Sequence, residues 1–142
     1  MNNITTFKIE KPARDVFEAF VDPEKIGNFW FSSSSERWEA GKTITLEYDL
    51  YNAKIQVDIV EVEENKKIVF AGGQDHTVTI TLNELDDSST KIQIVEEGFN
   101  ENDPNFIHQI LDNKEGWVFV LTCLKAYLEF GVTELRGGLL KG

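Results

Sequence analysis

The longest helical pattern of the chain lies near its C-terminus, in residues 112–131. Apolar side chains recur there every three or four positions and form one wide face, made of Trp117, Val120, Leu121, Leu124, Tyr127 and Leu128. Asp112 suits the N-cap, with Glu115 three residues later, and Gly131 suits the position just beyond the last turn. We therefore predict one long helix here, with residues 106–111 forming either a short extra helix or its first turns.

A period of two replaces the helical period between residues 42 and 98. Apolar residues alternate there in short runs separated by polar turns, which is typical of antiparallel strands joined as hairpins. A change of phase between Ile59 and Val60 indicates a β-bulge. The positions that define these strands are Ile44, Leu46, Tyr48 and Leu50 on one face of the first, then Ile55, Val57 and Ile59, then Ile68 and Phe70, then Val78, Ile80 and Leu82, and finally Ile92, Ile94 and Glu96.

The N-terminal part predicts one further strand and two short helices. Residues 3–10 alternate as a strand does, and Pro12 then suits the first turn of a helix. The Asp-Pro pair at residues 22–23 suits the start of a second helix. For the serine-rich segment 31–41 we expect a surface loop that leads into a strand, and the alternative is a mobile rim over a pocket.

Length and charge narrow the possible classes of protein. A chain of 142 residues predicts a single domain over residues 1–142, with residues 131–142 as a loosely held tail. The net charge of −11 disfavours nucleic acid and anionic membrane surfaces, because both are bound through lysine and arginine. No apolar run approaches the ~20 residues of a membrane span, and the N-terminus lacks the apolar core of a signal peptide. We therefore expect a cytoplasmic protein.

Groups that could bind metals or catalyse reactions are few. His76 and His108 each lack a second histidine at metal-binding spacing, so we expect no zinc site and no other metal or cofactor. Cys123 lies in the predicted long helix, where we expect a small buried apolar residue and the alternative is a reactive thiol. No motif combines a base, a nucleophile and an orienting group, so we expect no catalytic residue and favour a protein that is not an enzyme.

Several motifs, taken in order, resemble one known family. The first is carried by Ile9, Pro12, Val16, Phe17, Phe20, Asp22, Pro23 and Trp30. Gly41 follows, and then come residues 60–62 with 67–70, Thr90 with Ile92, Ile94 and Glu96, and Gly116-Trp117 with Leu121, Leu124, Leu128 and Glu129. Ala71 and Gly72 depart from the pattern where an aromatic residue is usual. From Ile4 to Gly131 the chain resembles the activators of the heat shock protein 90 (Hsp90) ATPase, within the START-like (SRPBCC, Bet v 1-like) superfamily.

This resemblance implies an α+β helix-grip fold. Such a fold has a strongly curved antiparallel sheet of about six to seven strands, two short helices and a long C-terminal helix, often with an apolar cavity between sheet and helix. Members of the superfamily transfer lipids, bind hormones, cyclise polyketides or regulate a chaperone. The family pattern is structural, so it implies no catalytic residue for this chain.

We expect the domain to bind a small hydrophobic ligand in a cavity between the sheet and the C-terminal helix, as a monomer or a homodimer. Glu96 either lies in solvent near the end of its strand, or points inward to a partner such as Arg37, Lys54 or a tyrosine hydroxyl and orients the ligand. The alternative function is interaction with an Hsp90-type chaperone, and the third is a cyclase- or hydrolase-type enzyme with Glu96 or His76 as general base. The candidate ligand-binding residues are Phe20, Trp30, Trp38, Tyr48, Phe70, Glu96, Trp117, Leu121, Leu124, Tyr127 and Leu128.

Overall fold

A seven-stranded antiparallel sheet forms the body of the protein, in the order β1-β7-β6-β5-β4-β3-β2. The structure, a computed structural model, describes residues 2–72 and 75–140. The strands are β1 (Asn3–Ile9), β2 (Ser33–Ser34), β3 (Thr43–Tyr48), β4 (Ala53–Glu63), β5 (Lys67–Gly72), β6 (His76–Asp86) and β7 (Ser89–Glu97). Every neighbouring pair is antiparallel, as the short polar turns predicted.

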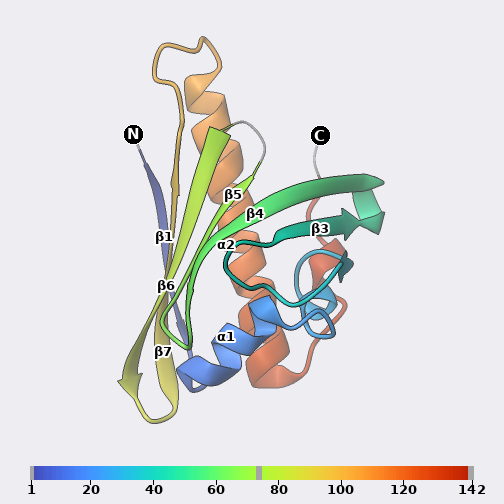
Figure 1. Cartoon of the computed structure of the whole chain (residues 1–142), viewed down its shortest axis with the longest axis vertical. Coiled ribbons are helices and arrows are strands. Elements are labelled where there is room, and N and C mark those ends of the chain that lie inside the picture. The colour runs from blue at the N-terminus through green and yellow to red at the C-terminus, as the bar shows by residue number, and fades with distance from the viewer. Residues whose placement is uncertain (1, 73–74, 141–142) are drawn as a thin grey trace.

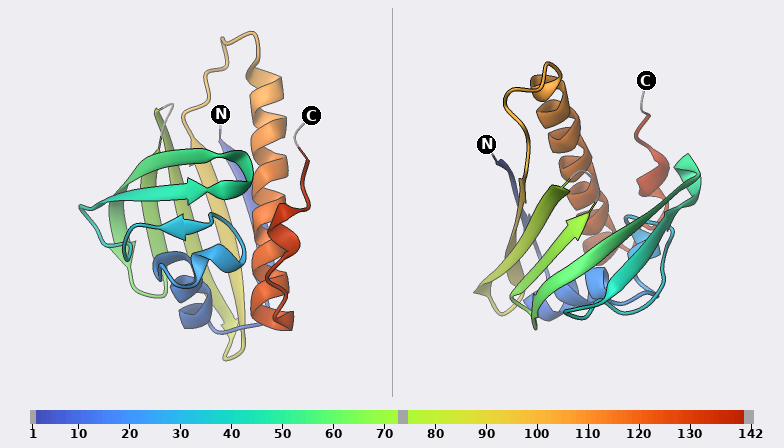
Figure 2. Two further views of the ribbon diagram at one scale, coloured as in Figure 1. Left: turned by 90° about the vertical axis from the view of Figure 1, so that its right-hand side faces the viewer. Right: turned by 45° about the horizontal axis from the view of Figure 1, so that its top comes forward.

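The helices lie on one side of this sheet and at its end. They are α1 (Ala13–Val21) and α2 (Phe106–Phe130), with short 3₁₀ turns η1 (Ile26–Asn28), η2 (Asp49–Tyr51) and η4 (Leu135–Gly137). Figures 1 and 2 show β3 and β4 running across the direction of β1, β6 and β7, so the sheet is strongly curved. Helix α2 runs beside β1, and α1 packs near the C-terminal half of α2. This is the helix-grip arrangement, and the predicted fold class is confirmed.

The long helix begins earlier than its cap signals predicted. Asp112 is not the N-cap, because α2 already starts at Phe106 with Asn105 before it. The chain enters the helix through a turn in which the Asp103 carboxylate accepts from the Asn105 backbone N–H at 2.8 Å, and no Gly or Pro interrupts residues 106–111. The predicted end is correct: Gly131 has φ +69°, and its N–H donates to the Tyr127 carbonyl at 3.0 Å.

The second predicted helix is replaced by a turn. The Asp22 carboxylate accepts from the Glu24 backbone N–H at 2.9 Å, as an N-cap would, but the chain continues only into the 3₁₀ turn η1. A Cβ on Gly27 would lie 2.9 Å from the Ser32 carbonyl oxygen, so the chain folds back tightly at once. Within segment 31–41, Ser33 and Ser34 pair with β3 as the short edge strand β2.

The predicted strand patterns agree with the structure except at the end of β3. The predicted bulge is confirmed, because the register between β4 and β5 shifts between Ile59 and Glu61 and leaves Val60 58% exposed. Leu50 was predicted to lie in the same strand as Tyr48, on the same face, and this is wrong. The strand ends at Tyr48, and Leu50 lies 52% exposed in η2, because the chain must turn there to enter β4.

Aromatic side chains fill much of the core between α1, η1 and α2. The Phe20 ring meets the Phe29 ring edge to face, with centroids 5.2 Å apart, and the Phe29 ring stacks on Tyr127 at 6.3 Å. Cys123 is buried in α2, and burial raises the pKa of its thiol to about 11, so the thiolate is disfavoured as expected for a packing residue.

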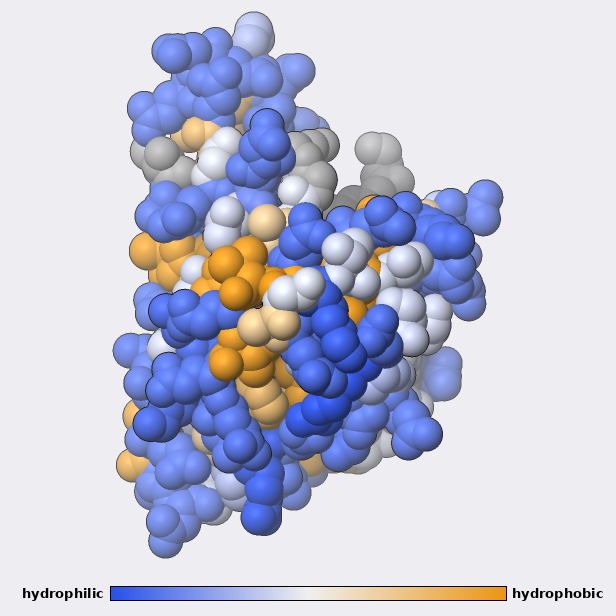
Figure 3. Space-filling model, viewed as in Figure 1, coloured by the Kyte–Doolittle hydropathy of each residue, from blue (hydrophilic) through white to orange (hydrophobic). Residues whose placement is uncertain are grey.

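The hydropathy of the surface differs between the ends and the middle of the molecule. In the view of Figure 3, hydrophilic residues cover the top and bottom, while apolar residues gather at mid-height. Of the helices in the described ranges, none has the length and apolarity that a membrane crossing needs.

Gly98, just after β7, packs directly against the start of β6. Its φ is +114°, and a Cβ there would lie 2.7 Å from the Asp75 carbonyl oxygen and 2.9 Å from Cδ2 of His76. Gly41 also has a positive φ, of +89°, but a Cβ there would meet nothing within 4 Å. A side chain at Gly41 would therefore meet backbone strain alone, whereas a side chain at Gly98 would meet both backbone strain and steric crowding.

We predict that Gly98→Ala destabilises the protein more than Gly41→Ala. Both substitutions cost on the order of 1–3 kcal/mol of backbone strain, and only Gly98→Ala adds a clash with the backbone of β6. The free energy of unfolding in urea measures the difference. Equal losses in the two variants would contradict a close approach at Gly98.

Candidate functional site

A cavity of about 280 Å³ lies between the N-terminal half of α2, the turn after β3 and the C-terminal tail. Apolar and aromatic side chains form most of its wall, and a few polar groups converge on it. Its lining residues are Trp30, Tyr48, Tyr51, Glu96, Asp112, Asn113, Gly116, Trp117, Phe119, Val120 and Leu139. This is the space between curved sheet and helix in which the sequence predicted a ligand site.

A second hollow of about 180 Å³ adjoins the first on the sheet side. The two share Trp30, Glu96 and Trp117, and the smaller one continues over β4, β5 and β6 past Phe70 and Val78. The rings of Trp30 and Trp117 lie with centroids 5.2 Å apart and planes tilted by 56°. These two tryptophans therefore stand at the boundary between the two spaces.

Glu96 is the buried carboxylate of the site, with 8% of its surface exposed. The Trp117 indole N–H donates to its Oε1 at 2.9 Å, and Nδ1 of His76 lies 2.7 Å from its Oε2. His76 comes close because β6 pairs Val78 with Glu96, which places residue 76 diagonally opposite on the same face. Each carboxylate oxygen thus has one partner, as burial requires.

The expected partners of Glu96 were wrong, whereas its inward direction was correct. The Arg37 guanidinium instead binds the Glu18 carboxylate through two hydrogen bonds of 2.8 and 2.7 Å. That pairing lowers the pKa of Glu18. Lys54 lies beside Glu47 on the neighbouring strand. The solvent-exposed alternative fails because α2 covers the end of β7 and brings Trp117 onto the carboxylate.

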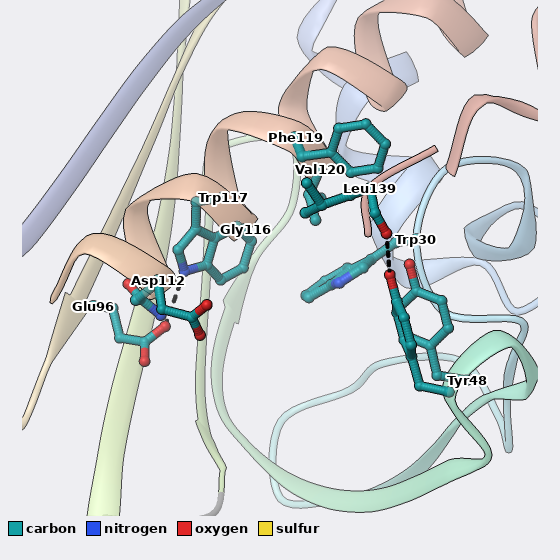
Figure 4. Close-up of a pocket in the computed structure, with 11 residues that line it drawn as sticks. Trp30, Tyr48, Glu96, Asp112, Gly116, Trp117, Phe119, Val120 and Leu139 are labelled. Atoms are coloured by element: carbon teal, nitrogen blue, oxygen red, sulfur yellow. Dashed lines mark hydrogen bonds between the residues drawn. The ribbon is translucent and has the colours of Figure 1, made fainter. Parts of the chain in front are cut away.

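Tyrosines and the C-terminal tail close the other side of the larger cavity. The rings of Tyr48 and Tyr51 lie 4.8 Å apart, and the Tyr51 hydroxyl donates to the Leu139 carbonyl at 2.9 Å. Burial raises the pKa of the Tyr48 phenol, so it remains a neutral hydrogen-bonding group. The tail was expected to be loosely held unless Leu139 and Leu140 tied it down, and Leu139 does lie against the site (Figure 4).

The eleven predicted site residues fall into three groups. Trp30, Tyr48, Glu96 and Trp117 line the larger cavity, and Phe70 lines the smaller one. Tyr127 and Leu128 lie about two turns of α2 beyond Val120, half-buried beside Lys11, Asp15 and Lys25. The remaining four are core residues with at most 2% of their surface exposed: Phe20, Trp38, Leu121 and Leu124.

Sequence reasoning missed the lining residues that depend on tertiary contacts. Tyr51 and Leu139 reach the cavity only because the turn after β3 meets the tail. Asp112 and Asn113 were assigned to the start of the helix, but they lie inside α2 and face the cavity. Gly116 did carry a signal, because a glycine in the middle of a helix is unfavourable unless packing or function needs it.

The site offers acid–base and hydrogen-bonding groups rather than a metal cluster. Among residues 2–72 and 75–140, no three His, Cys, Asp or Glu side chains are grouped so that they could hold a metal ion. His76 and Glu96 can exchange protons or hydrogen bonds with a bound molecule, and the phenols can donate or accept.

Comparisons with known proteins agree with this architecture. A sequence model of the family described as "Activator of Hsp90 ATPase homolog 1-like protein" matches residues 10–129. The crystal structure of protein SSP2350 from Staphylococcus saprophyticus is 51% identical, with a TM-score of 0.86 over 94% of this chain and 95% of that chain. A search of curated proteins gave no match.

More distant structures share the fold. The Aha1 dimer from Colwellia psychrerythraea is 15% identical, with a TM-score of 0.79 over 92% of this chain and 98% of that chain. An HSP90 activator from Plasmodium falciparum is 18% identical, with a TM-score of 0.69 over 92% and 96%. Since the family model spans nearly all of the sheet and most of α2, the chain belongs to the family of Activator of Hsp90 ATPase homolog 1-like proteins.

Proposed function

We propose that this domain binds a small, mostly apolar molecule in the larger cavity between the curved sheet and α2. The observation that carries the proposal is the cavity itself, about 280 Å³ in volume, with aromatic walls and a buried carboxylate. Ligand pockets usually combine apolar walls with a few polar groups over ~300–1,000 Å³. The cavity lies at the lower end of this range, which favours a small ligand.

The energetic cost of empty space supports an occupant. An unfilled cavity costs on the order of 24 cal/mol per Å³. For about 280 Å³ this is roughly 7 kcal/mol, comparable with the ~5–15 kcal/mol stability of a whole domain. The cavity opens to solvent, so water fills it in the absence of a ligand, and an apolar ligand that displaces this water from the aromatic walls gains binding free energy.

Gly116 keeps part of this space open. It lies in the middle of α2 and lines the cavity, and a Cβ on it would meet nothing within 4 Å. Glycine costs a helix about 1 kcal/mol relative to alanine, so the helix is less stable than an alanine would make it. A larger side chain at this position would occupy the volume that we assign to the ligand.

We predict that Gly116→Leu abolishes ligand binding while Gly116→Ala retains it. The alanine variant should also gain about 0.5–1 kcal/mol in the free energy of unfolding, because it fits the helix better. Titration with the neutral fluorescent probe N-phenyl-1-naphthylamine measures binding. Native mass spectrometry of each purified variant checks for a co-purified molecule. Equal probe affinity in both variants would place the bound probe outside this cavity and count against the proposal.

Interaction with an Hsp90-type chaperone is a second candidate. The family match supports it, as does an apolar row on the outer side of α2, where Ile107 is 65% exposed and Leu111 64% exposed. These positions are four residues apart and therefore neighbours on the helix surface. The net charge of −11 suits docking onto a basic protein surface.

For this candidate we predict that the protein raises the ATPase rate of a purified Hsp90-type chaperone, and that the double variant Ile107→Asp, Leu111→Asp does not. Val60→Asp serves as control, because Val60 is also exposed, at 58%, but lies on β4. An ATPase rate that neither the wild-type protein nor either variant changes, together with no binding in a pull-down at low salt, would rule out the interaction.

A further inference from the structure

The chemistry of the lining residues specifies which ligand the proposed function would serve. We propose that the ligand carries a positively charged organic group, a protonated amine or a quaternary ammonium, attached to an apolar body. This inference rests on ligand binding in the larger cavity and names the class of molecule bound there.

The ionisable lining residues are acidic. Glu96 and Asp112 contribute carboxylates, and among the described lining residues there is no lysine or arginine. Arg136 is nearby but lies outside the lining, where its guanidinium is 3.4 Å from both the Trp30 carbonyl and the Ser32 hydroxyl. With a net charge of −11, the whole chain also attracts cations. An anionic ligand would therefore be repelled both by the carboxylates of the lining and by the net charge of the whole chain.

Glu96 supplies a negative charge for either cationic group and, for a protonated amine, also a hydrogen-bond acceptor. An ionised carboxylate only accepts hydrogen bonds and offers about four lone-pair positions, of which Trp117 and His76 occupy one on each oxygen. The group is mostly buried, and interactions between charges are stronger where water is excluded. Asp112 adds a second carboxylate to the lining, on its exposed side.

The aromatic walls suit the same group. Cations bind favourably over the faces of tryptophan and tyrosine rings within about 6 Å. Trp30 and Trp117 lie with centroids 5.2 Å apart, and Tyr48 and Tyr51 with centroids 4.8 Å apart. Figure 4 shows Glu96 and Asp112 on one side of the cavity, with Tyr48 across from them and Trp30 between. A cationic head at the acidic side would leave its apolar body among the rings.

Three probes of similar size test the charge requirement. Benzyltrimethylammonium carries the cation, neopentylbenzene is its neutral carbon isostere, and 3-phenylpropanoate carries an anion. Perturbation of the Trp30 and Trp117 indole N–H resonances reports binding, and its loss in Gly116→Leu assigns that binding to the larger cavity, because Gly116 lines only this one of the two spaces. We expect the cation to bind the wild-type protein about tenfold or more tightly than the isostere, and the anion not to bind.

The variant Glu96→Gln assigns this preference to the carboxylate. It should bring the cation-to-isostere ratio close to one while leaving the affinity of the isostere unchanged, because glutamine keeps the shape and can still accept from Trp117. Glu63→Gln is the matched control, since its carboxylate lies at the exposed end of β4 and should leave the ratio unchanged.

Each outcome decides between the proposals. An isostere that binds the wild-type protein as tightly as the cation overturns the cationic ligand and leaves the binding function standing. A ratio that Glu96→Gln does not change, in a folded variant, also overturns it. Failure of all three probes and of the neutral fluorescent probe overturns both proposals. If Glu96→Gln does not fold, the wild-type series alone decides.

Discussion

The structure depends on one constraint: the apolar face of α2 has to be buried by a sheet that curves away from it. The core side chains of α2, among them Leu121 and Leu124, are fully covered where α1 and the straight strands lie close. Toward the N-terminal half of the helix, β3 and β4 turn across the sheet direction and the gap widens (Figure 2). Side chains fill this gap only in part, and the cavity is what remains.

The same curvature explains why a carboxylate can be buried at the edge of that cavity. Glu96 lies near the end of β7, where an exposed position would ordinarily satisfy it with water. Helix α2 covers this end, so the carboxylate depends on protein donors instead. His76 from β6 and Trp117 from α2 provide them, and the tight turn at Gly98 allows the imidazole to approach. Backbone geometry, packing and polarity of the site are thus coupled.

The residues that line the cavity show how proteins with a common fold can differ in the chemistry of their sites. The helix-grip arrangement is shared with structures only 15–18% identical to this chain, so the fold alone does not determine what is bound. In the proposed binding function, the groups that would select a ligand are lining side chains from the turn after β3, the middle of α2 and the C-terminal tail, together with Glu96 of β7.

The sequence by itself determined the order and type of the longer elements, because periods of two and of 3.6 directly reflect which faces are buried. It did not determine the 3₁₀ turn η1, which replaces the second short helix. It also indicated the bulge near Val60 and the end of α2 at Gly131, since both depend on local pattern, but it left the direction of Glu96 open between solvent and the interior. The sequence left the start of α2 open between residues 106 and 112, and a local turn fixes it at Phe106, whereas the composition of the site was decided only by tertiary structure. Asp112 looked like a cap because capping signals are short, and its place inside α2 depends on the turn at Asp103. The partners of Glu96 and the closure by Leu139 join residues far apart in the chain, and no local pattern encodes contacts of that kind.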